Sequence, residues 1–327
     1  MSMLLEVKDL RVSFKTYMGV VRALRGVSFS VDRRQSIAIV GESGCGKSVL
    51  AQSLMKLIVT PPGVIESGQV LLEGDDLLCK SNKEIERIRG KEIGMIFQDP
   101  MTSLNPTMRI GKQIMEGLRK HLRMSRDKAF ARAVEMLELV GISNPTRRAL
   151  QYPHELSGGM RQRVIIAIAL ALEPKVLIAD EPTTALDVTI QAQILELMKK
   201  IQKRMDTSII FITHDLGVVA NLCDQVMVMY AGKIVEKGSV RQIYHHPAHP
   251  YTRGLLKSCP RLDMDTKERL LPIEGSPPNL LHIPSGCAFC PRCSEAMRIC
   301  ANREPKTFQV SLSHKVDCWK HANQETI

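Results

Sequence analysis

The stretch Gly41–Ser48 constrains the fold of this chain more than any other. It reads GESGCGKS and fits G-x-x-x-x-G-K-[ST], a pattern typical of phosphate-binding loops. It follows Ser36–Val40, an apolar and β-branched run that is typical of a buried strand. Glycines let successive amide groups point at phosphate oxygens, and the N-terminus of a following helix adds its positive dipole end. The stretch therefore predicts a strand, loop and helix that bind a nucleotide, with Lys47 at the β- and γ-phosphates and Ser48 on Mg²⁺.

Charge and hydropathy narrow the class of protein further. The chain has 327 residues, of which 45 are Lys or Arg and 34 are Asp or Glu, and the net charge of +11 favours partners that carry phosphates. The N-terminal residues 1–7 lack the pattern of a signal peptide. The longest helical apolar run, Val164–Leu172, is shorter than the roughly 20 residues that cross a bilayer. We therefore expect a cytosolic protein. A basic face on residues 109–123 lacks interleaved aromatic residues, which disfavours nucleic acid as a partner.

Strand patterns alternate with helix patterns along most of the chain. This order predicts an α/β fold with a parallel sheet that helices cover on both faces. The expected strands are residues 5–14, 27–31, 69–72, 93–97, 176–181 and 208–213, and the expected helices include residues 110–122, 130–140, 164–172 and 191–203.

Two carboxylates, Asp180 and Glu181, end the apolar run that begins at Val176. Charged residues are rare in buried strands, so acids at the C-terminal end of a strand indicate metal or water chemistry at the ligand-binding edge of the sheet. An acidic turn that merely ends the strand is the alternative. His214 follows the next expected strand, and a lone histidine there is more often a core residue than a catalytic one.

The segment from residue 241 onward is rich in proline, which predicts a separate, loop-rich region. Five cysteines gather in it with the spacing Cys287-x2-Cys290-x2-Cys293-x6-Cys300-x17-Cys318. A set of sulfur ligands suits an iron–sulfur cluster or zinc, and unligated thiols are the remaining alternative.

These stretches together resemble the ABC ATPases, from about residue 4 to the end of the chain. The matching motifs are Gly41–Ser48 for the Walker A motif, Gln98 for the Q-loop, Leu156–Met160 for the LSGGQ motif with Met in its last place, Val176–Glu181 for the Walker B strand, Ala185–Asp187 for the D-loop and His214 for the switch histidine. The resemblance implies a P-loop NTPase with a mostly parallel core sheet, an antiparallel β subdomain and a helical subdomain near residues 100–160. The ATPase domain would cover residues 1–240, and residues 241–327 would form a small, loop-rich, metal-binding extension.

The resemblance also assigns roles to residues of the ATP site. Asp180 would hold Mg²⁺, Glu181 would act as the general base on the attacking water, and Gln98 would reach both the Mg²⁺ and the water. With Glu181 and Gln98, His214 would complete the catalytic set. Phe14 would stack on adenine, with Tyr17 as the alternative. The loop residues that would bind ATP are Gly41, Glu42, Ser43, Gly44, Cys45, Gly46, Lys47 and Ser48.

The motif Ser157-Gly158-Gly159 implies a second subunit. In the family it caps the γ-phosphate of an ATP held by the opposing subunit, so two such domains would face each other head to tail. Met160 removes a polar side chain from the motif but leaves its amide groups.

The C-terminal region resembles one branch of the family, the ATPase subunits of oligopeptide and dipeptide importers. The resemblance is carried by His249–Leu256, by Ile273–Pro278 and by the cysteine cluster. In those subunits four cysteines bind a [4Fe-4S] cluster, and the matching positions are Cys287, Cys293, Cys300 and Cys318, with Cys290 as an extra thiol. The close spacing of the first three cysteines makes a different set of four possible, and structural zinc is the alternative.

The importer resemblance implies a set of partners and a location. A second ABC ATPase subunit, such as a paralogue, would pair with this chain beneath two membrane permease subunits, and an extracytoplasmic solute-binding protein would act indirectly. The chain would then be a peripheral protein on the cytoplasmic face of the inner membrane and would drive a peptide translocase. Three alternatives stay open: nickel or another small solute as cargo, a soluble ABC ATPase, or an iron–sulfur redox module regulated by ATP.

Overall fold

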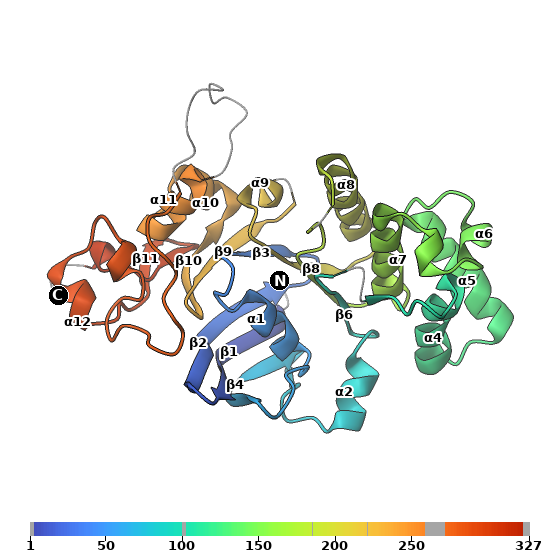
Figure 1. Cartoon of the computed structure of the whole chain (residues 1–327), viewed down its shortest axis with the longest axis horizontal. Coiled ribbons are helices and arrows are strands. Elements are labelled where there is room, and N and C mark those ends of the chain that lie inside the picture. The colour runs from blue at the N-terminus through green and yellow to red at the C-terminus, as the bar shows by residue number, and fades with distance from the viewer. Residues whose placement is uncertain (1–2, 100–102, 185, 221, 259–271, 323–327) are drawn as a thin grey trace. The chain divides into compact units, whose positions relative to one another are not determined.

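The computed structural model describes residues 3–99, 103–184, 186–220, 222–258 and 272–322. Its contacts divide the chain into two compact units. The first unit contains Met1–Asp32, Ser36–Cys79 and Phe211–Ile327, and the second contains Arg33–Gln35 and Lys80–Ile210. Figure 1 shows the chain with the labels of its helices and strands.

An antiparallel sheet forms one layer of the first unit. Its strand order is β2-β1-β4-β5, with β1 at Met3–Thr16, β2 at Gly19–Asp32, β4 at Gly63–Leu72 and β5 at Asp75–Asp76 (Figure 1). β1 pairs with both β2 and β4, and several bulges interrupt the register. This sheet confirms the antiparallel β subdomain that the sequence predicted, although each of its three long strands extends beyond the predicted range.

The second layer of the first unit contains the strand that precedes the phosphate loop. β3 (Ser36–Val40) runs parallel to β9 (Gln225–Tyr230), and β10 (Lys233–Ser239) pairs antiparallel with β9. The C-terminal region adds two further strands, because β12 (His314–Val316) pairs with β10 and β11 (Phe308–Ser311) pairs with β12. The sequence predicted only a loop-rich region here, since strands of three and four residues leave almost no periodic pattern.

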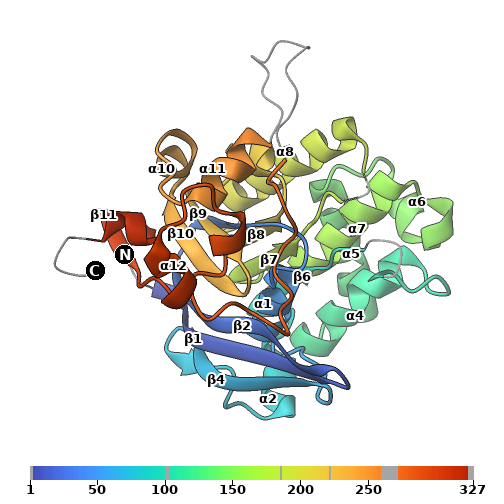
Figure 2. The ribbon, with the colours of Figure 1, turned by 60° about the vertical axis from the view of Figure 1, so that its left-hand side comes forward.

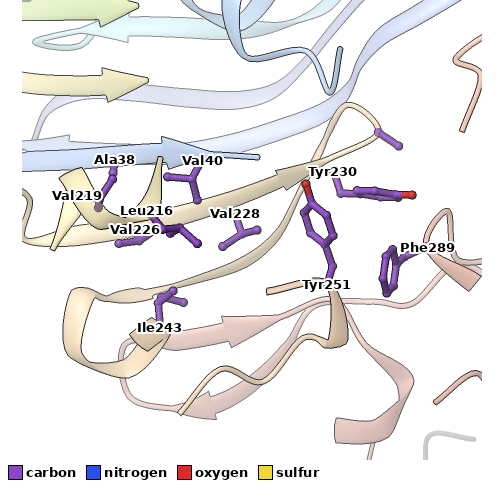
Figure 3. Close-up of a cluster of buried hydrophobic side chains, with 11 residues drawn as sticks. Ala38, Val40, Leu216, Val219, Val226, Val228, Tyr230, Ile243, Tyr251 and Phe289 are labelled. Carbon is purple, nitrogen blue, oxygen red and sulfur yellow. The ribbon is translucent and has the colours of Figure 1, made fainter. Parts of the chain in front are cut away.

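Short helices cover the second layer. The first unit contains α1 (Lys47–Leu54), α9 (Leu216–Val219), α10 (Val240–His245), α11 (Pro250–Lys257) and α12 (Arg298–Asn302), with single turns η2 (Cys290–Arg292) and η3 (Trp319–His321). Figure 2 shows α10 and α11 over β9 and β10. Ile243 of α10 and Tyr251 of α11 pack with Val226 and Val228 of β9 in one buried cluster, drawn in Figure 3. The cluster also includes Phe289, so the C-terminal region shares the core of the layer that contains β3 and β9.

The second unit combines buried strands with a group of helices. β6 (Ile93–Ile96) and β7 (Val176–Asp180) are parallel, and β8 (Ser208–Thr213) crosses the boundary between the units. The helices are α2 (Asn82–Ile88), α4 (Ile110–Leu122), α5 (Arg126–Leu139), α6 (Pro145–Ala149), α7 (Gly158–Leu170) and α8 (Val188–Arg204), with the single turn η1 (Pro153–Glu155). Ile110, Ile114 and Leu118 are buried as their four-residue spacing predicts, whereas Leu122, in the last turn, is exposed. Three of these helices, α4, α5 and α6, lie within residues 100–160, where the resemblance implied a helical subdomain.

Candidate functional site

The phosphate loop lies between β3 and α1 in the first unit, in the context that the motif requires. All five residues of β3 are buried, and Gly46 is the residue before the first turn of α1. Gly46 has a φ of 105°, and a Cβ atom there would lie 2.6 Å from the carbonyl oxygen of Ala23. Only glycine accepts both this backbone conformation and this close approach. The side chain of Ser48 lies in the first turn of the helix and is half-buried.

Lys47 folds back over the loop. The residue is 5% exposed, and its Nζ atom donates hydrogen bonds to the carbonyl oxygens of Gly41, at 2.8 Å, and Glu42, at 3.1 Å. Burial raises the pKa of the Cys45 thiol, and the nearby Lys47 acts in the opposite direction. Cys45 is therefore a buried side chain within the loop, where burial disfavours the thiolate.

The backbone of Glu181 has a conformation that residues other than glycine rarely adopt. It follows the fully buried strand β7, and its φ is 46°. Its Oε2 atom accepts a hydrogen bond from Gln98 Nε2, at 3.0 Å, and another from Thr184 Oγ1, at 2.9 Å. Strained backbone that the surroundings fix in place is common at functional sites. The structure thus brings together Gln98 and Glu181, two predicted site residues 83 positions apart, and adds Thr184, which the sequence analysis missed.

Asp180 and Gln162 complete this part of the second unit. Asp180, the last residue of β7, is only 3% exposed. Gln162 of α7 is 1% exposed and donates a hydrogen bond from Nε2 to the carbonyl oxygen of Pro182, at 2.6 Å. This hydrogen bond therefore connects α7, the helix that begins at the Ser157-Gly158-Gly159 motif, to the turn that contains Glu181. Gln162 lies between Arg161 and Arg163, ahead of the apolar part of the helix, and the sequence gives no signal for its burial.

The motif Ser157-Gly158-Gly159 opens helix α7 and leaves its first turn accessible. Ser157 is the N-cap, and its Oγ atom accepts a hydrogen bond from the Met160 amide at 3.4 Å. Both Ser157 and Gly158 are exposed, and a Cβ atom on Gly158 would meet nothing within 4 Å. An accessible helix N-terminus with free amide groups suits an anionic ligand.

The other predicted site residues lie in both compact units of the chain. His214 is exposed directly after β8, and Asp215 caps the short helix α9. Phe14 is half-buried on β1, where it packs next to Gly63 of β4. Tyr17 is 99% exposed in the turn between β1 and β2. The phosphate loop, His214, Phe14 and Tyr17 belong to the first unit, whereas Gln98, Ser157, Asp180 and Glu181 belong to the second. Of the predicted D-loop, Ala185 lies outside the described residues, and Asp187 caps α8.

The C-terminal cysteines are free thiols that affect one another electrostatically. Burial raises the pKa of Cys287 to about 11, and the neighbouring Cys300 and Cys318 act in the same direction. Burial also raises the pKa of Cys293, with a further contribution from Cys300. The amide of Cys287 donates to the carbonyl oxygen of Cys300 at 2.8 Å. Within the described ranges, however, no three or more His, Cys, Asp or Glu side chains are arranged to hold a metal ion.

Two residues of the C-terminal region reach the phosphate loop, and the sequence analysis did not predict either contact. The hydroxyl of Tyr251 accepts a hydrogen bond from the Glu42 amide at 2.8 Å, and the guanidinium of Arg292 pairs with the Glu42 carboxylate. Tyr251 lies in the stretch that carries the resemblance to peptide importers, and Arg292 lies between two of the cysteines. Neither position shows a sequence signal for a partner in the loop.

Comparisons with known proteins agree with these motifs. Residues 24–184 match the family described as ABC transporter, and residues 235–300 match the one described as the C-terminal region of oligopeptide/dipeptide transporters. The chain is 63% identical to the oligopeptide transport ATP-binding protein OppD of Bacillus subtilis, over 97% of the chain and 88% of that protein. It is 54% identical to the dipeptide transport ATP-binding protein DppD of the same organism, over 98% of the chain and 95% of that protein.

Solved structures show the same fold. A dimeric ATP-binding cassette in a post-hydrolysis state, bound to ADP and Pi, matches with a TM-score of 0.66 and 27% identity, over 73% of this chain and 99% of that one. A cassette from Clostridium perfringens, part of a transporter complex, matches with a TM-score of 0.64 and 30% identity, over 75% of this chain and 92% of that one. Among the described helices, none is long and apolar enough to cross a membrane.

Proposed function

The chain is an ATPase of the ABC transporter family, of the branch with the oligopeptide/dipeptide C-terminal region, and we propose that it powers the uptake of peptides. The observation that carries the proposal is the Glu181 carboxylate, which is fixed by Gln98 and Thr184 at the end of a buried strand. The relatives named for oligopeptide and dipeptide transport favour peptides over nickel or another small solute as cargo.

The catalytic step is the hydrolysis of ATP to ADP and phosphate. The phosphate loop binds the triphosphate through its amide groups and through Lys47, whose ammonium is already held over the loop. Glu181 takes a proton from the attacking water, while Gln98 and Thr184 hold its carboxylate in place. His214, exposed at the end of β8, senses the γ-phosphate. Phe14 stacks on adenine, and Tyr17, fully exposed in its turn, is the alternative.

Mg²⁺ suits the oxygen atoms that the chain offers. Ser48 would contribute a hydroxyl at the start of α1, Asp180 would contribute a buried carboxylate at the end of β7, and Gln98 would contribute an amide oxygen. Hard cations prefer such oxygen ligands, so the donor set fits the ion. When bound, Mg²⁺ neutralises charge on the phosphates during transfer.

The thiols of the C-terminal region fit a sulfur-ligated group by their chemistry. Cys287, Cys293, Cys300 and Cys318 would hold a [4Fe-4S] cluster, and zinc is the alternative. Support comes from the backbone, where the amide of Cys287 donates to the carbonyl oxygen of Cys300 at 2.8 Å and the amide of Cys293 donates to that of Cys290 at 3.2 Å. Such a group would supply folding energy to a region with little apolar content. Iron and zinc analysis of the purified chain, with Cys300→Ser as the comparison, tests this part of the proposal.

The proposed assembly is a head-to-tail pair of ATPase subunits beneath two membrane permease subunits. The exposed N-terminus of α7, at Ser157-Gly158-Gly159, would cap the γ-phosphate of an ATP bound by the second subunit, which is a paralogue or another copy. Closure of the pair on ATP and its release on hydrolysis would drive the permease, to which an extracytoplasmic binding protein delivers the peptide. We place the chain peripherally on the cytoplasmic face of the inner membrane.

We divide the chain by function into an ATPase domain, residues 1–240, and a C-terminal extension, residues 241–327. The match of residues 235–300 to the C-terminal region of oligopeptide/dipeptide transporters supports a boundary near residue 241. The compact units in the structure follow a different division, because the extension shares a core with β3 and β9.

The test of the catalytic proposal is Glu181→Gln, with Glu173→Gln as the matched control. Glu173 also has a positive φ, 52°, but it is exposed and paired with Arg132. Loss of the general base should lower the rate of ATP hydrolysis by about 10²- to 10⁴-fold while ATP still binds. The control should hydrolyse ATP at the wild-type rate. Rapid turnover by Glu181→Gln would exclude Glu181 as the base.

A further inference from the structure

The second residue of the phosphate loop is held from the far end of the sequence. Arg292 donates from its two terminal nitrogens to the two carboxylate oxygens of Glu42, at 2.6 and 2.9 Å, across 250 positions of the chain. The Glu42 amide donates to the Tyr251 hydroxyl at 2.8 Å. A bidentate pair fixes direction as well as distance. Both the side chain and the backbone of Glu42 are therefore fixed by the C-terminal region.

The side chain of Arg292 is buried and is held by several contacts. Its side chain is only 4% exposed. Its Nε atom donates to the carbonyl oxygen of Glu274 at 2.9 Å, and its guanidinium lies 5.9 Å from the ring centre of Tyr230 and 6.0 Å from that of Phe289. An arginine guanidinium is always charged in proteins, and that of Arg292 lies 2.6 Å from the Glu42 carboxylate. A buried and fully oriented cation of this kind can set the position of its partner.

Tyr251 is equally constrained. It is fully buried, and its ring packs 4.6 Å from that of Tyr230 and 5.4 Å from that of Phe289, measured between ring centres (Figure 3). Its amide donates to Nδ1 of His249 at 3.0 Å. Burial lowers the pKa of His249 to about 3, with Arg253 and His321 acting in the same direction. His249 is therefore neutral and free to accept this hydrogen bond.

Glu42 links these groups to the nucleotide-binding lysine. Its carbonyl oxygen accepts from Lys47 Nζ at 3.1 Å. Its carboxylate also acts on the loop electrostatically, because it contributes to the raised pKa of Cys45, after the larger effect of burial. An unpaired carboxylate at this position would repel the phosphates that the loop binds. The charge of Arg292 cancels this repulsion, and its two hydrogen bonds hold the carboxylate in one orientation.

We propose that Arg292 is a positioning residue for ATP, which acts through Glu42 to neutralise the carboxylate in the phosphate loop and to fix the loop for the triphosphate. The inference rests on the proposed ATP site at Gly41–Ser48 and assigns that site a part from the C-terminal extension. The proposed effect of Arg292 on ATP is indirect and needs no contact between its side chain and the nucleotide. Its effect on ATP should vanish when Glu42 loses its charge, and this dependence separates positioning from a general role in folding.

The experiment measures the affinity of the full-length chain for a fluorescent ATP analogue. Arg292→Gln should weaken binding by about tenfold, because it leaves the Glu42 carboxylate partly buried and without a cation. Glu42→Gln combined with Arg292→Gln should recover most of the affinity, because both charges are then absent. The matched control is Arg253→Ala, which breaks an ion pair of 2.9 Å with Glu295 in the same extension and should leave ATP affinity unchanged.

The outcomes separate this inference from the proposed function. If the wild-type chain fails to bind the analogue, the ATP site is wrong. If the wild type binds and Arg292→Gln binds equally well, the positioning role is refuted. Equal weakness of the single and double variants would also refute it, because the effect would then not pass through the charge of Glu42.

Arg292→Lys provides a second variant in case Arg292→Gln does not fold. It keeps the charge but loses the fork that matches a carboxylate, so affinity should fall by only about threefold. Unchanged affinity in this variant would exclude a role for the bidentate geometry. If Arg292→Lys loses ATP affinity and also unfolds, as seen in the fluorescence of the single tryptophan, the residue is structural and the proposal is overturned.

Discussion

Glu236 is the buried carboxylate whose removal should damage the C-terminal extension most. The residue is 1% exposed, and it lies on β10, where the extension joins the sheet. Its Oε1 atom accepts from the Ala248 amide at 2.7 Å and lies 2.7 Å from Nε2 of His314, and its Oε2 atom accepts from the His249 amide at 2.9 Å. One side chain thus satisfies three polar groups of the extension, all of them buried.

The expected cost follows from those three partners. Glu236→Ala leaves two backbone amides and one imidazole without an acceptor, and each unsatisfied buried group costs about 1–3 kcal/mol. Since water can enter the space vacated by the side chain, we expect a loss near the lower end of the summed range, about 4 kcal/mol. Glu236→Gln keeps one oxygen acceptor and should lose roughly half as much. A loss of this size is a large fraction of the stability of an ordinary domain.

Urea unfolding followed by tryptophan fluorescence measures this loss. The chain has a single tryptophan, Trp319, which is 6% exposed and lies next to Phe308 in the extension. The control is Lys315→Ala, an exposed residue on β12, which should change stability by less than about 0.5 kcal/mol. If Glu236→Ala unfolds at the same urea concentration as this control, the three hydrogen bonds do not carry the stability assigned to them.

Three further results are expected. Because the pKa of His249 is about 3 in the folded chain and near 6.5 when unfolded, stability is full above pH 6.5 and falls as the pH decreases toward 3. His249→Asn keeps a hydrogen-bond acceptor but removes the titrating imidazole. The free energy of unfolding should therefore fall by about 2 kcal/mol less between about pH 7.5 and 5 in urea titrations. An unchanged pH dependence would refute this assignment. Gly46→Ala should abolish binding of the fluorescent ATP analogue, because its Cβ would lie 2.6 Å from the Ala23 carbonyl oxygen, and normal binding would contradict the loop geometry. Ser157→Ala should cost about 1 kcal/mol or less in urea unfolding but lower the ATPase rate of the assembled pair, and an unchanged rate would argue against the proposed role of the motif in the opposing site.

Local sequence patterns predicted most of the individual elements. The strand at 208–213 matches the structure residue for residue, and the apolar stripe at residues 110, 114, 118 and 122 lies on helix α4, because a buried strand and an amphipathic helix each have a characteristic periodicity. Along α5 the predicted stripe was half right. Leu137 and the following Val140 are buried, whereas Phe130 and Val134 are only half-buried. Ala129, Ala133 and Met136 complete the buried face. The buried Ala129 and Ala133 are small residues that face the neighbouring helices. Alanine has a low value on hydrophobicity scales, so a search for apolar stripes does not pick out these two positions.

By itself the sequence determined the phosphate loop, the carboxylates Asp180 and Glu181 and the motif at Ser157, because each is a short string whose chemistry depends on adjacent residues. The tertiary structure decided which distant groups meet. It placed Arg292 and Tyr251 on Glu42 across 250 and 209 positions, and it buried Glu236 beneath the extension. Such contacts depend on strand order and core packing, which no local pattern encodes. For this reason the sequence predicted a separate C-terminal appendage, whereas in the structure the appendage shares the core of the nucleotide-binding layer and holds its phosphate loop.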